Sequence, residues 1–140
     1  MNVERNTFSI LTKGHYDFID ITERVEEIVE KSGVEDGLVL VFCKGSTSAI
    51  TLMEYEEGLI EDLKEAFERI APEFGDYKHH LRWGDRNGAA HIKSAMIKPS
   101  LVVPLEEGKL WLGTWQQIVL IDFDERPRQR EVIVKILGVS

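Results

Sequence analysis

A segment of ten residues, GDRNGAAHIK at 84–93, places an acid, a base, a carboxamide and an imidazole at the start of a predicted helix. A surface turn needs only a glycine or an asparagine, so these four side chains require another explanation. The first turn of a helix exposes free backbone N–H groups at its positive end, which favour a bound anion. Because His91 falls in that turn, the segment predicts the polar mouth of a small active site.

Ionisable side chains gather around this helix start. Thirteen positions contain His79, His80, Asp85, Asn87 and His91, and therefore three of the four histidines in the chain. Imidazole can bind a metal ion or transfer protons near neutral pH, and clustered ionisable groups are typical of functional sites. We expect His79, Asp85 and His91 to be catalytic, and His79 and His91 to be the ligands of any divalent metal, Zn²⁺ or Mg²⁺. Asn87 is expected to bind substrate.

Each of these residues also has a purely structural interpretation. Asp85 or Asn87 could cap the helix, and His79 and His80 could be an exposed pair in a loop. The spacing from His79 to His91 is much longer than the i, i+4 pair of a zinc-binding helix. The cluster as a whole favours a functional pocket for a metal ion or a phosphate group.

The loop KGSTS at 44–48 is a second candidate, because it follows a buried strand and offers several hydroxyls and backbone donors. We expect Ser46, Thr47 and Ser48 to bind a phosphate or a substrate hydroxyl. The loop lacks the ending and the following helix of a P-loop, and a simple Ser/Thr turn explains it equally well. Glu54, on the next strand, is expected to face the same cleft, with a solvent-facing carboxylate as the alternative.

The segment GTWQQIVLIDFDERPRQR at 113–130 is a third candidate. Strand alternation turns one of two adjacent glutamines inward, where a buried amide must find partners, so we expect Gln116 to line the substrate pocket or to bond across a subunit interface. The charged run at the end of the segment is expected to be a solvated hairpin tip. Arg128 and Arg130 could bind a phosphate if that tip folds over a cleft, including one in a neighbouring subunit.

The hydrophobic pattern predicts strands at both ends of the chain and helices between them. Helical spacing of apolar residues indicates helices at 22–33, 57–73 and 89–98, the last with Ile92, Ala95 and Met96 facing inward. Alternating or continuous apolar runs indicate strands at 7–13, 16–22, 37–43, 49–55, 100–108, 109–124 and 130–138. Short turns between consecutive strands imply antiparallel pairing. We therefore predict one α+β domain over 1–140, mainly an antiparallel sheet or sandwich with two or three helices.

The composition excludes several classes of protein. The 140 residues are 43% hydrophobic and 30% charged, which is typical of a globular chain, and the net charge of -8 argues against a general nucleic-acid surface. No apolar run approaches the roughly 20 residues of a membrane span, and no signal peptide is visible, so we expect a cytoplasmic protein. Cys43 is the only cysteine and lies in a buried-strand pattern, which indicates a core thiol.

Taken together, these motifs resemble those of the YjbQ family of small bacterial and archaeal proteins, over nearly the whole chain beyond residue 6. The resemblance rests on spaced aromatic, imidazole, carboxylate and amide positions, a Val-Pro strand, an LGTWQ segment and a charged run. The matching positions are Tyr77, His79, Asp85, Asn87, Ala90, His91, Val103, Pro104, 112–116 and 122–130, together with the earlier segment STSAITLMEYE that contains Glu54.

The resemblance implies an α+β fold and a homotrimer. It also implies the activity of a secondary thiamine-phosphate synthase, which joins hydroxymethylpyrimidine diphosphate to thiazole phosphate. The ligand would then be a phosphorylated small molecule, bound in a polar site that holds His79, Asp85, Asn87 and His91. If pyrophosphate leaves in this reaction, the start of the 89–98 helix, Lys93 or an arginine of 126–130 must neutralise it.

Three departures from the family pattern bear on activity. The family has a histidine in its first motif, an asparagine before Glu54 and a glycine before the Pro-Ser pair, where this chain has Gly45, Met53 and Lys98. Loss of the histidine removes a ligand or an acid/base. It therefore favours a second hypothesis, a non-catalytic phosphate- or metal-binding regulatory module. A third hypothesis is a structural homotrimer whose polar cluster only joins subunits.

Two tryptophans of the C-terminal part add to the expectation of self-association. Trp111 and Trp115 are expected in the core or in an interface between copies of the chain. A domain of this size with an apolar strand such as LVVPL could bury further surface against copies of itself.

Overall fold

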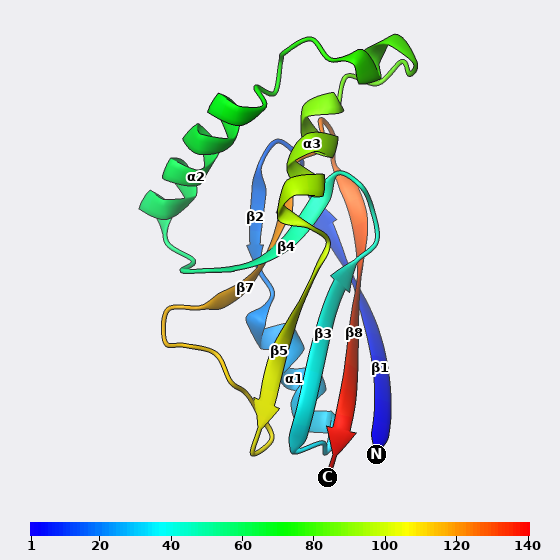
Figure 1. The fold of residues 1–140 in the computed structure, drawn as a ribbon, viewed down its shortest axis with the longest axis vertical. Coiled ribbons are helices and arrows are strands. Elements are labelled where there is room, and N and C mark those ends of the chain that lie inside the picture. Colours follow the sequence, from blue (N-terminus) through cyan, green and yellow to red (C-terminus); the bar gives the residue numbers. More distant parts are fainter.

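Three α-helices and two antiparallel sheets make up the structure, a computed structural model that describes residues 1–140 (Figure 1). The five-stranded sheet has the order β1-β8-β3-β5-β6, and the three-stranded sheet has the order β2-β7-β4. This arrangement confirms the predicted α+β class. The strands are β1 (Asn2–Thr12), β2 (Asp17–Asp20), β3 (Asp36–Cys43), β4 (Ser48–Met53), β5 (Ser100–Glu106), β6 (Lys109–Leu110), β7 (Gln117–Asp122) and β8 (Arg128–Val139). The helices are α1 (Thr22–Ser32), α2 (Glu57–Ile70), α3 (Gly88–Ile97) and a short 3-10 helix, η1 (Lys78–Leu81).

Strand β7 is buried on both faces and connects two hydrophobic cores. Ile118 and Leu120 pack with α1 and the inner face of the five-stranded sheet, whereas Val119 and Ile121 pack with Phe67 of α2. A strand covered on both sides needs apolar residues at every position, which explains the continuous IVLI run in its sequence.

The first helix lies where its sequence predicts. Gly33 ends α1 with a φ of 71°, a conformation that glycine adopts without steric cost. Thr22 is the first residue of the helix. Its hydroxyl donates to Asp20 Oδ1 at 2.6 Å and accepts the backbone N–H of Ile118 at 2.8 Å, so it ties the helix start to β7.

The third helix turns a different face to the core from the predicted one. Ile92 and Met96 are 38% and 54% exposed, whereas Ala90, Lys93 and Ser94 are buried. The small side chains allow α3 to lie close to β4, where the Ser94 hydroxyl donates to a β4 carbonyl oxygen at 2.6 Å. Close contact between helix and strand therefore selects the face with small residues over the face with large ones.

Lys93 is only 1% exposed because its ammonium group finds partners inside the protein. Nζ donates to the carbonyl oxygen of Ala71 at 3.0 Å and to the hydroxyl of Tyr16, and Glu68 Oε2 lies 3.6 Å away. Burial lowers the pKa of Lys93, and the nearby Glu68 carboxylate opposes that effect. The ammonium thus ties α3 to the end of α2, and it is not placed to neutralise a pyrophosphate at the start of α3.

Two predictions about strands are wrong for the same reason: the chain crosses from one sheet to the other between β1 and β2 and again between β6 and β7. The strands expected at 7–13 and 16–22 are β1 and β2, but β1 pairs with β8 and β2 pairs with β7. The strand expected at 109–124 is divided into β6 and β7 by a turn, in which Gln116 Oε1 accepts the N–H of Gly113 at 2.8 Å. Strand periodicity predicts the buried face of a strand but not the sheet that it joins.

The turns after β1, β3 and β7 meet the start of α3 at one end of the molecule, opposite both chain termini (Figure 1). Gly14, with a φ of 78°, allows the turn after β1 to touch the turn after β7, since a Cβ there would lie 2.7 Å from the Arg126 carbonyl oxygen. The N–H of Phe123 donates to the carbonyl oxygen of Thr47 at 3.0 Å and joins the turn after β7 to the turn after β3.

None of the helices combines the length and the apolar surface needed to cross a membrane.

Candidate functional site

The two ends of the charged turn after β7 are buried, so the prediction of a solvated hairpin tip is wrong for them, although Arg126 and Pro127 between them are exposed. Asp122 and Asp124 have 0% of their surface exposed, and Arg130 has 7%. Asp122 lies at the end of the central strand of the three-stranded sheet and Arg130 near the start of β8, so the turn between them folds their side chains together. Buried charges are stable only when they are paired and hydrogen-bonded, and these three side chains meet both conditions.

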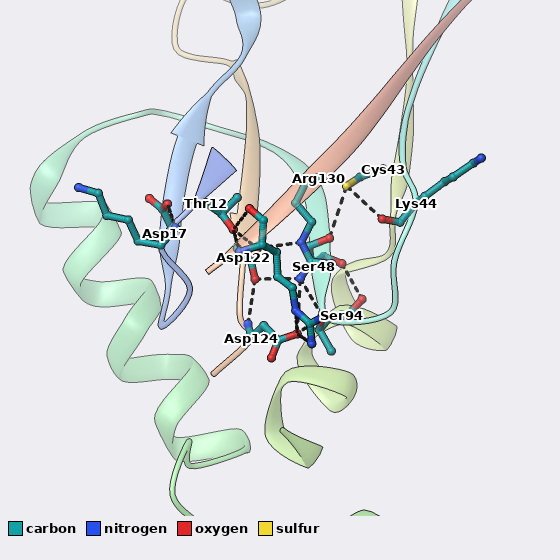
Figure 2. Close-up of polar contacts among 12 residues, drawn as sticks. Thr12, Asp17, Cys43, Lys44, Ser48, Ser94, Asp122, Asp124 and Arg130 are labelled. Atoms are coloured by element: carbon teal, nitrogen blue, oxygen red, sulfur yellow. Dashed lines mark hydrogen bonds and ion pairs between the residues drawn. The ribbon is translucent and has the colours of Figure 1, made fainter. Parts of the chain in front are cut away.

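Asp122 and Arg130 form a two-pronged ion pair at the centre of this cluster (Figure 2). Arg130 Nε donates to Asp122 Oδ2 at 2.8 Å and Nη2 donates to Oδ1 at 3.0 Å. The Thr12 hydroxyl, at the end of β1, donates to the same carboxylate. Two N–H donors of the planar guanidinium thus face the two oxygens of the carboxylate. Such a bidentate pair is among the strongest side-chain pairings in proteins.

Asp124 accepts hydrogen bonds from four residues in three segments of the chain. It accepts the Thr47 hydroxyl at 2.8 Å, the Glu125 N–H at 2.7 Å, Arg128 Nε at 3.0 Å and Asn87 Nδ2 at 3.4 Å. Burial alone would raise the pKa of Asp124, but the bonds from Thr47 and Glu125 and the Arg128 charge outweigh it and hold that pKa below its usual range. Asp124 is therefore an anchored carboxylate.

His79 of η1 and His91 of α3 lie face to face beside this cluster. Their ring centroids are 4.4 Å apart, and the ring planes are inclined by 36°. Burial, together with His79, lowers the pKa of His91 below its ordinary value of 6.5, although Asp124 and Asp85 act in the opposite direction. His91 is therefore a neutral imidazole at neutral pH, able to accept or donate a hydrogen bond.

Three buried polar atoms near these rings have no hydrogen-bond partner within the chain. They are Nδ1 of His79, Nδ1 of His80 and Oδ1 of Asn87. His80 Nε2 accepts the N–H of Gly88 at 3.1 Å, so the neutral ring carries its proton on the unpartnered Nδ1. Buried polar atoms are normally paired, so these atoms mark places where a ligand group or a water molecule completes the site.

The start of α3 offers fewer free donors than its sequence predicts. The N–H of Gly88 is bonded to His80, and the N–H of Ala90 is bonded to the Asn87 carbonyl oxygen at 3.0 Å. In the first three residues of the helix, only the N–H of Ala89 has no acceptor in the chain. An anion bound by the bare helix start alone is therefore not favoured.

The structure brings some of the predicted site residues together. Thr47, Asn87, Arg128 and Arg130 all belong to the network around Asp122 and Asp124, and His79 and His91 lie beside it. Ser48 is buried in the same region (Figure 2), where its hydroxyl lies 3.5 Å from Cys43 Sγ. The catalytic and binding roles of these residues stay predictions.

Other predicted residues lie apart from the cluster. Asp85 is exposed and makes no hydrogen bond, so it acts on His91 only through its charge, and Ser46 is likewise exposed. Gln116 and Glu54 lie at the opposite end of the three-stranded sheet, because Met53 pairs with Gln117 there while Ser48 pairs with Asp122. Gln116 is exposed and bonds to its own turn, so neither glutamine of the pair is the buried amide that we expected.

Sequence reasoning missed the residues that organise the site. Thr12, Asp122 and Asp124 were not assigned to it, although two aspartates two positions apart at the end of the run IVLIDFD are a recognisable signal. A carboxylate that directly continues a strand buried on both faces must itself be buried, and a buried carboxylate requires a cation nearby. The spaced arginines that follow supply it.

The donor set does not fit a metal ion. The His79 and His91 rings are stacked, and no group of three or more histidine, cysteine, aspartate or glutamate side chains is arranged to hold a metal. His80 cannot act as the third ligand through Nε2, because that atom accepts the Gly88 N–H. A zinc site needs three or four converging protein ligands, and the two imidazoles are not the carboxylate ligands that Mg²⁺ prefers, so no chemical step is assigned to a metal here.

We predict that His91 titrates below pH 6.5 and that His15 titrates above it, because His15 is hydrogen-bonded to Glu73. Replacing His79 with alanine removes burial and the neighbouring imidazole, both of which lower the pKa of His91, so the midpoint of His91 should rise toward 6.5 while that of His15 stays unchanged. Long-range ¹H–¹⁵N NMR spectra over a pH series measure both midpoints in one sample. A His91 midpoint at or above that of His15 would contradict the described burial.

The lowered pKa of His91 also determines how the stability of the folded protein depends on pH. The folded protein binds a proton on His91 more weakly than the unfolded chain does. The contribution of neutral His91 to stability is therefore complete above pH 6.5 and is lost as the pH falls through the lower, folded-state pKa.

The chain is similar to known proteins over nearly its whole length. Residues 6–139 match the family described as UPF0047 protein YjbQ-like. A UPF0047 protein of Archaeoglobus fulgidus is 45% identical over 129 residues, which are 92% of this chain and 98% of the relative. A UPF0047 protein of Methanothermobacter thermautotrophicus is 33% identical over 138 residues, which are 99% of this chain and 94% of the relative.

Solved structures share the fold. A YbjQ-like protein of unknown function from Sulfolobus solfataricus superposes with a TM-score of 0.87 at 36% identity, over 98% of this chain and 99% of the other. A YjbQ/UPF0047 family protein from Clostridium acetobutylicum gives a TM-score of 0.85 at 39% identity, over 94% and 99% of the two chains. With a family match from residue 6 to residue 139 and relatives this similar in sequence and fold, the chain belongs to the YjbQ/UPF0047 family.

Proposed function

We propose that the end of the molecule around His79, Asn87 and His91 binds a phosphorylated small molecule and catalyses a thiamine-phosphate-synthase type of transfer. The observation that carries the proposal is the set of buried polar atoms without partners, His79 Nδ1, His80 Nδ1 and Asn87 Oδ1, beside a neutral His91. A heterocycle such as a pyrimidine carries donors and acceptors that complement such atoms. A site with such atoms rejects analogues that would leave its buried polar atoms without hydrogen bonds.

The transfer itself forms a bond between the thiazole nitrogen and the methylene carbon of the pyrimidine, and it breaks the bond from that carbon to the diphosphate oxygen. Pyrophosphate leaves with the bonding electrons, so the residues must hold the two rings in line and stabilise the departing negative charge. Asn87 Oδ1 would accept a hydrogen bond from the pyrimidine amino group. Arg128, which is partly exposed and paired with Asp124, is the cation nearest the solvent side of the cluster.

A second candidate is a binding module without catalysis. It is favoured by the lack of any hydrogen bond between His79 or His91 and a carboxylate or hydroxyl, which an acid/base pair in catalysis normally has. It is also favoured by the arginines, whose charges are largely neutralised by Asp122 and Asp124.

Turnover and binding, measured together, separate the two candidates. We expect the wild-type protein to bind hydroxymethylpyrimidine diphosphate and to form thiamine phosphate. His91→Ala should reduce the rate by about a hundredfold, the usual effect of losing a general acid or base, while the dissociation constant changes less. His15→Ala, at an exposed histidine bonded to Glu73, is the matched control and should leave both unchanged. Isothermal titration and a product assay supply the two numbers.

Each outcome of this comparison has a clear meaning. Binding by the wild type without any product supports the module and overturns the transferase. Equal rates in wild type and His91→Ala would show that the chemistry lies elsewhere. No binding of either phosphorylated substrate would contradict both candidates.

We also propose that the chain forms a homotrimer through the outer face of the five-stranded sheet. A hollow of about 410 Å³ on this face is lined almost entirely by aliphatic side chains. The lining residues are Val3, Leu38, Leu40, Val102, Leu137 and the single charged Lys135. A contiguous apolar patch of this kind on a small protein is typical of a protein–protein interface. Trp111 and Trp115, 68% and 70% exposed, are not core residues, and an interface remains the alternative for them.

Light scattering coupled to size exclusion tests this assembly. We expect the wild type to have three times the mass of one chain, and Leu38→Asp to have the mass of one chain, because a carboxylate cannot be buried unpaired in an aliphatic interface. Leu81→Asp, at an exposed leucine of η1 outside the sheet, should remain trimeric. A monomeric wild type, or an unchanged mass for Leu38→Asp, would contradict the proposed interface.

A further inference from the structure

The guanidinium group of Arg130 has two donors that nothing in the chain uses. Arginine carries five N–H donors. The N–H of Nε and one N–H of Nη2 bond to Asp122, and the second N–H of Nη2 bonds to the Thr47 hydroxyl at 2.7 Å. Both N–H groups of Nη1 remain without an acceptor, although the residue is more than nine-tenths buried. Nη1 is not among the buried polar atoms without a partner, so this edge of the guanidinium reaches the surface and can bind a ligand group there.

Gly45 lies directly against the unused nitrogen. A Cβ built on Gly45 would lie 2.7 Å from Arg130 Nη1, and the next atom, Ser48 Oγ, would be 3.7 Å away. A side chain at this position would therefore press on the guanidinium edge, and the φ of 134° also disfavours any residue other than glycine. Without a side chain at Gly45, the guanidinium edge lies directly beside the exposed turn after β3.

The same turn supplies further donors. The backbone N–H groups of Gly45 and Ser46 have no acceptor in the chain, and the Ser46 hydroxyl is exposed. Figure 2 shows the side chain of Lys44 extending away from Arg130, so no cation of this turn blocks the guanidinium edge. The backbone donors of the turn and the planar guanidinium group of Arg130 therefore lie side by side. Such an arrangement suits an anion whose oxygens point in several directions.

We propose that a phosphate group docks on Nη1 of Arg130, beside Gly45 and the free N–H groups of its turn. This inference rests on the proposed function only for the identity of the ligand as a phosphate ester, and it places that ester's phosphate away from the two imidazoles. Asp122 and Asp124 balance the charges of Arg130 and Arg128, so binding comes from hydrogen bonds to a pre-oriented donor more than from net charge. The heterocycle would then extend from Gly45 across Asp124 toward Asn87, the two residues that are bonded to each other.

Inorganic phosphate is the probe that tests this subsite. In the wild type, we expect phosphate to shift the Nη1 proton resonances of Arg130 in ¹⁵N-labelled protein, saturably, with assignment through their Overhauser effects to the Gly45 α-hydrogens. Sodium chloride at equal ionic strength should not. Gly45→Ala should weaken phosphate binding by about tenfold or more, since the methyl group would displace the guanidinium edge that makes the charge-assisted bond.

Two controls separate this subsite from general effects. Gly33→Ala also adds a methyl group at a positive φ, 71°, with a smaller backbone penalty and nothing within 4 Å of the methyl group, and it should bind phosphate as the wild type does. His91→Ala should also keep phosphate binding, even if it loses turnover. Loss of turnover in a variant that still binds phosphate therefore does not contradict this inference. Turnover without phosphate binding at Arg130 would contradict it and would support only the proposed function.

The inference is overturned if the Arg130 Nη1 protons do not respond to phosphate in the wild type. It is also overturned if Gly45→Ala and Gly33→Ala bind phosphate equally. Should Gly45→Ala fail to fold, the wild-type spectra alone decide the question.

Discussion

Two carboxylates without any contact to solvent, Asp122 and Asp124, sit at the end of a strand that is apolar on both faces. Taking a charge out of water costs several kcal/mol unless cations and hydrogen bonds replace the solvent. The chain meets this requirement with Arg130 and Arg128 from the start of β8, only a few residues further along. The turn after β7 must therefore fold back on itself, and this forces the chain to pass from the three-stranded sheet to the five-stranded sheet at that point.

The position of the candidate site follows from this ion network. Thr12 ends β1, Thr47 precedes β4 and Asn87 precedes α3, and each contributes a polar group to one of the two aspartates. The segments that could bind a ligand are thus held by the same two carboxylates, even though they are far apart in the sequence. His79 and His91 are not part of the network, but the helix that carries His91 begins directly after Asn87, which is bonded to Asp124. A change at either aspartate would therefore move the whole end of the molecule.

The sequence predicts the local features of this fold well, because local features follow from spacing and backbone preference. The α1 helix, the start of the α2 helix and the short turn between β5 and β6 all lie as expected. Sheet membership could not be predicted, since a strand has the same period of two in either sheet. The buried face of α3 was wrong because Lys93 reads as a surface residue, and only the Ala71 carbonyl and Tyr16 explain its burial.

The same distinction applies to the candidate site. Clustering in the sequence identified His79, Asn87 and His91, which the fold does bring together near Asp124. It could not exclude Gln116 and Glu54, because both flank strands whose other ends reach the site. It assigned Arg128 and Arg130 to a ligand without the aspartates that hold them, since pairing between residues depends on how the turn folds. Gly45, a departure from the family pattern, has a physical meaning only once Arg130 lies against it.

A double-mutant cycle between Asp122 and Arg130 tests the central claim most directly. Urea unfolding of Asp122→Asn, Arg130→Met and the double variant gives the coupling energy, and the exposed pair Asp76–Arg86 provides a matched cycle. If the buried network organises this end of the protein, the Asp122–Arg130 coupling should be about 2 kcal/mol or more. The Asp76–Arg86 pair should then show no measurable coupling. Couplings that cannot be distinguished between the two pairs would contradict the account.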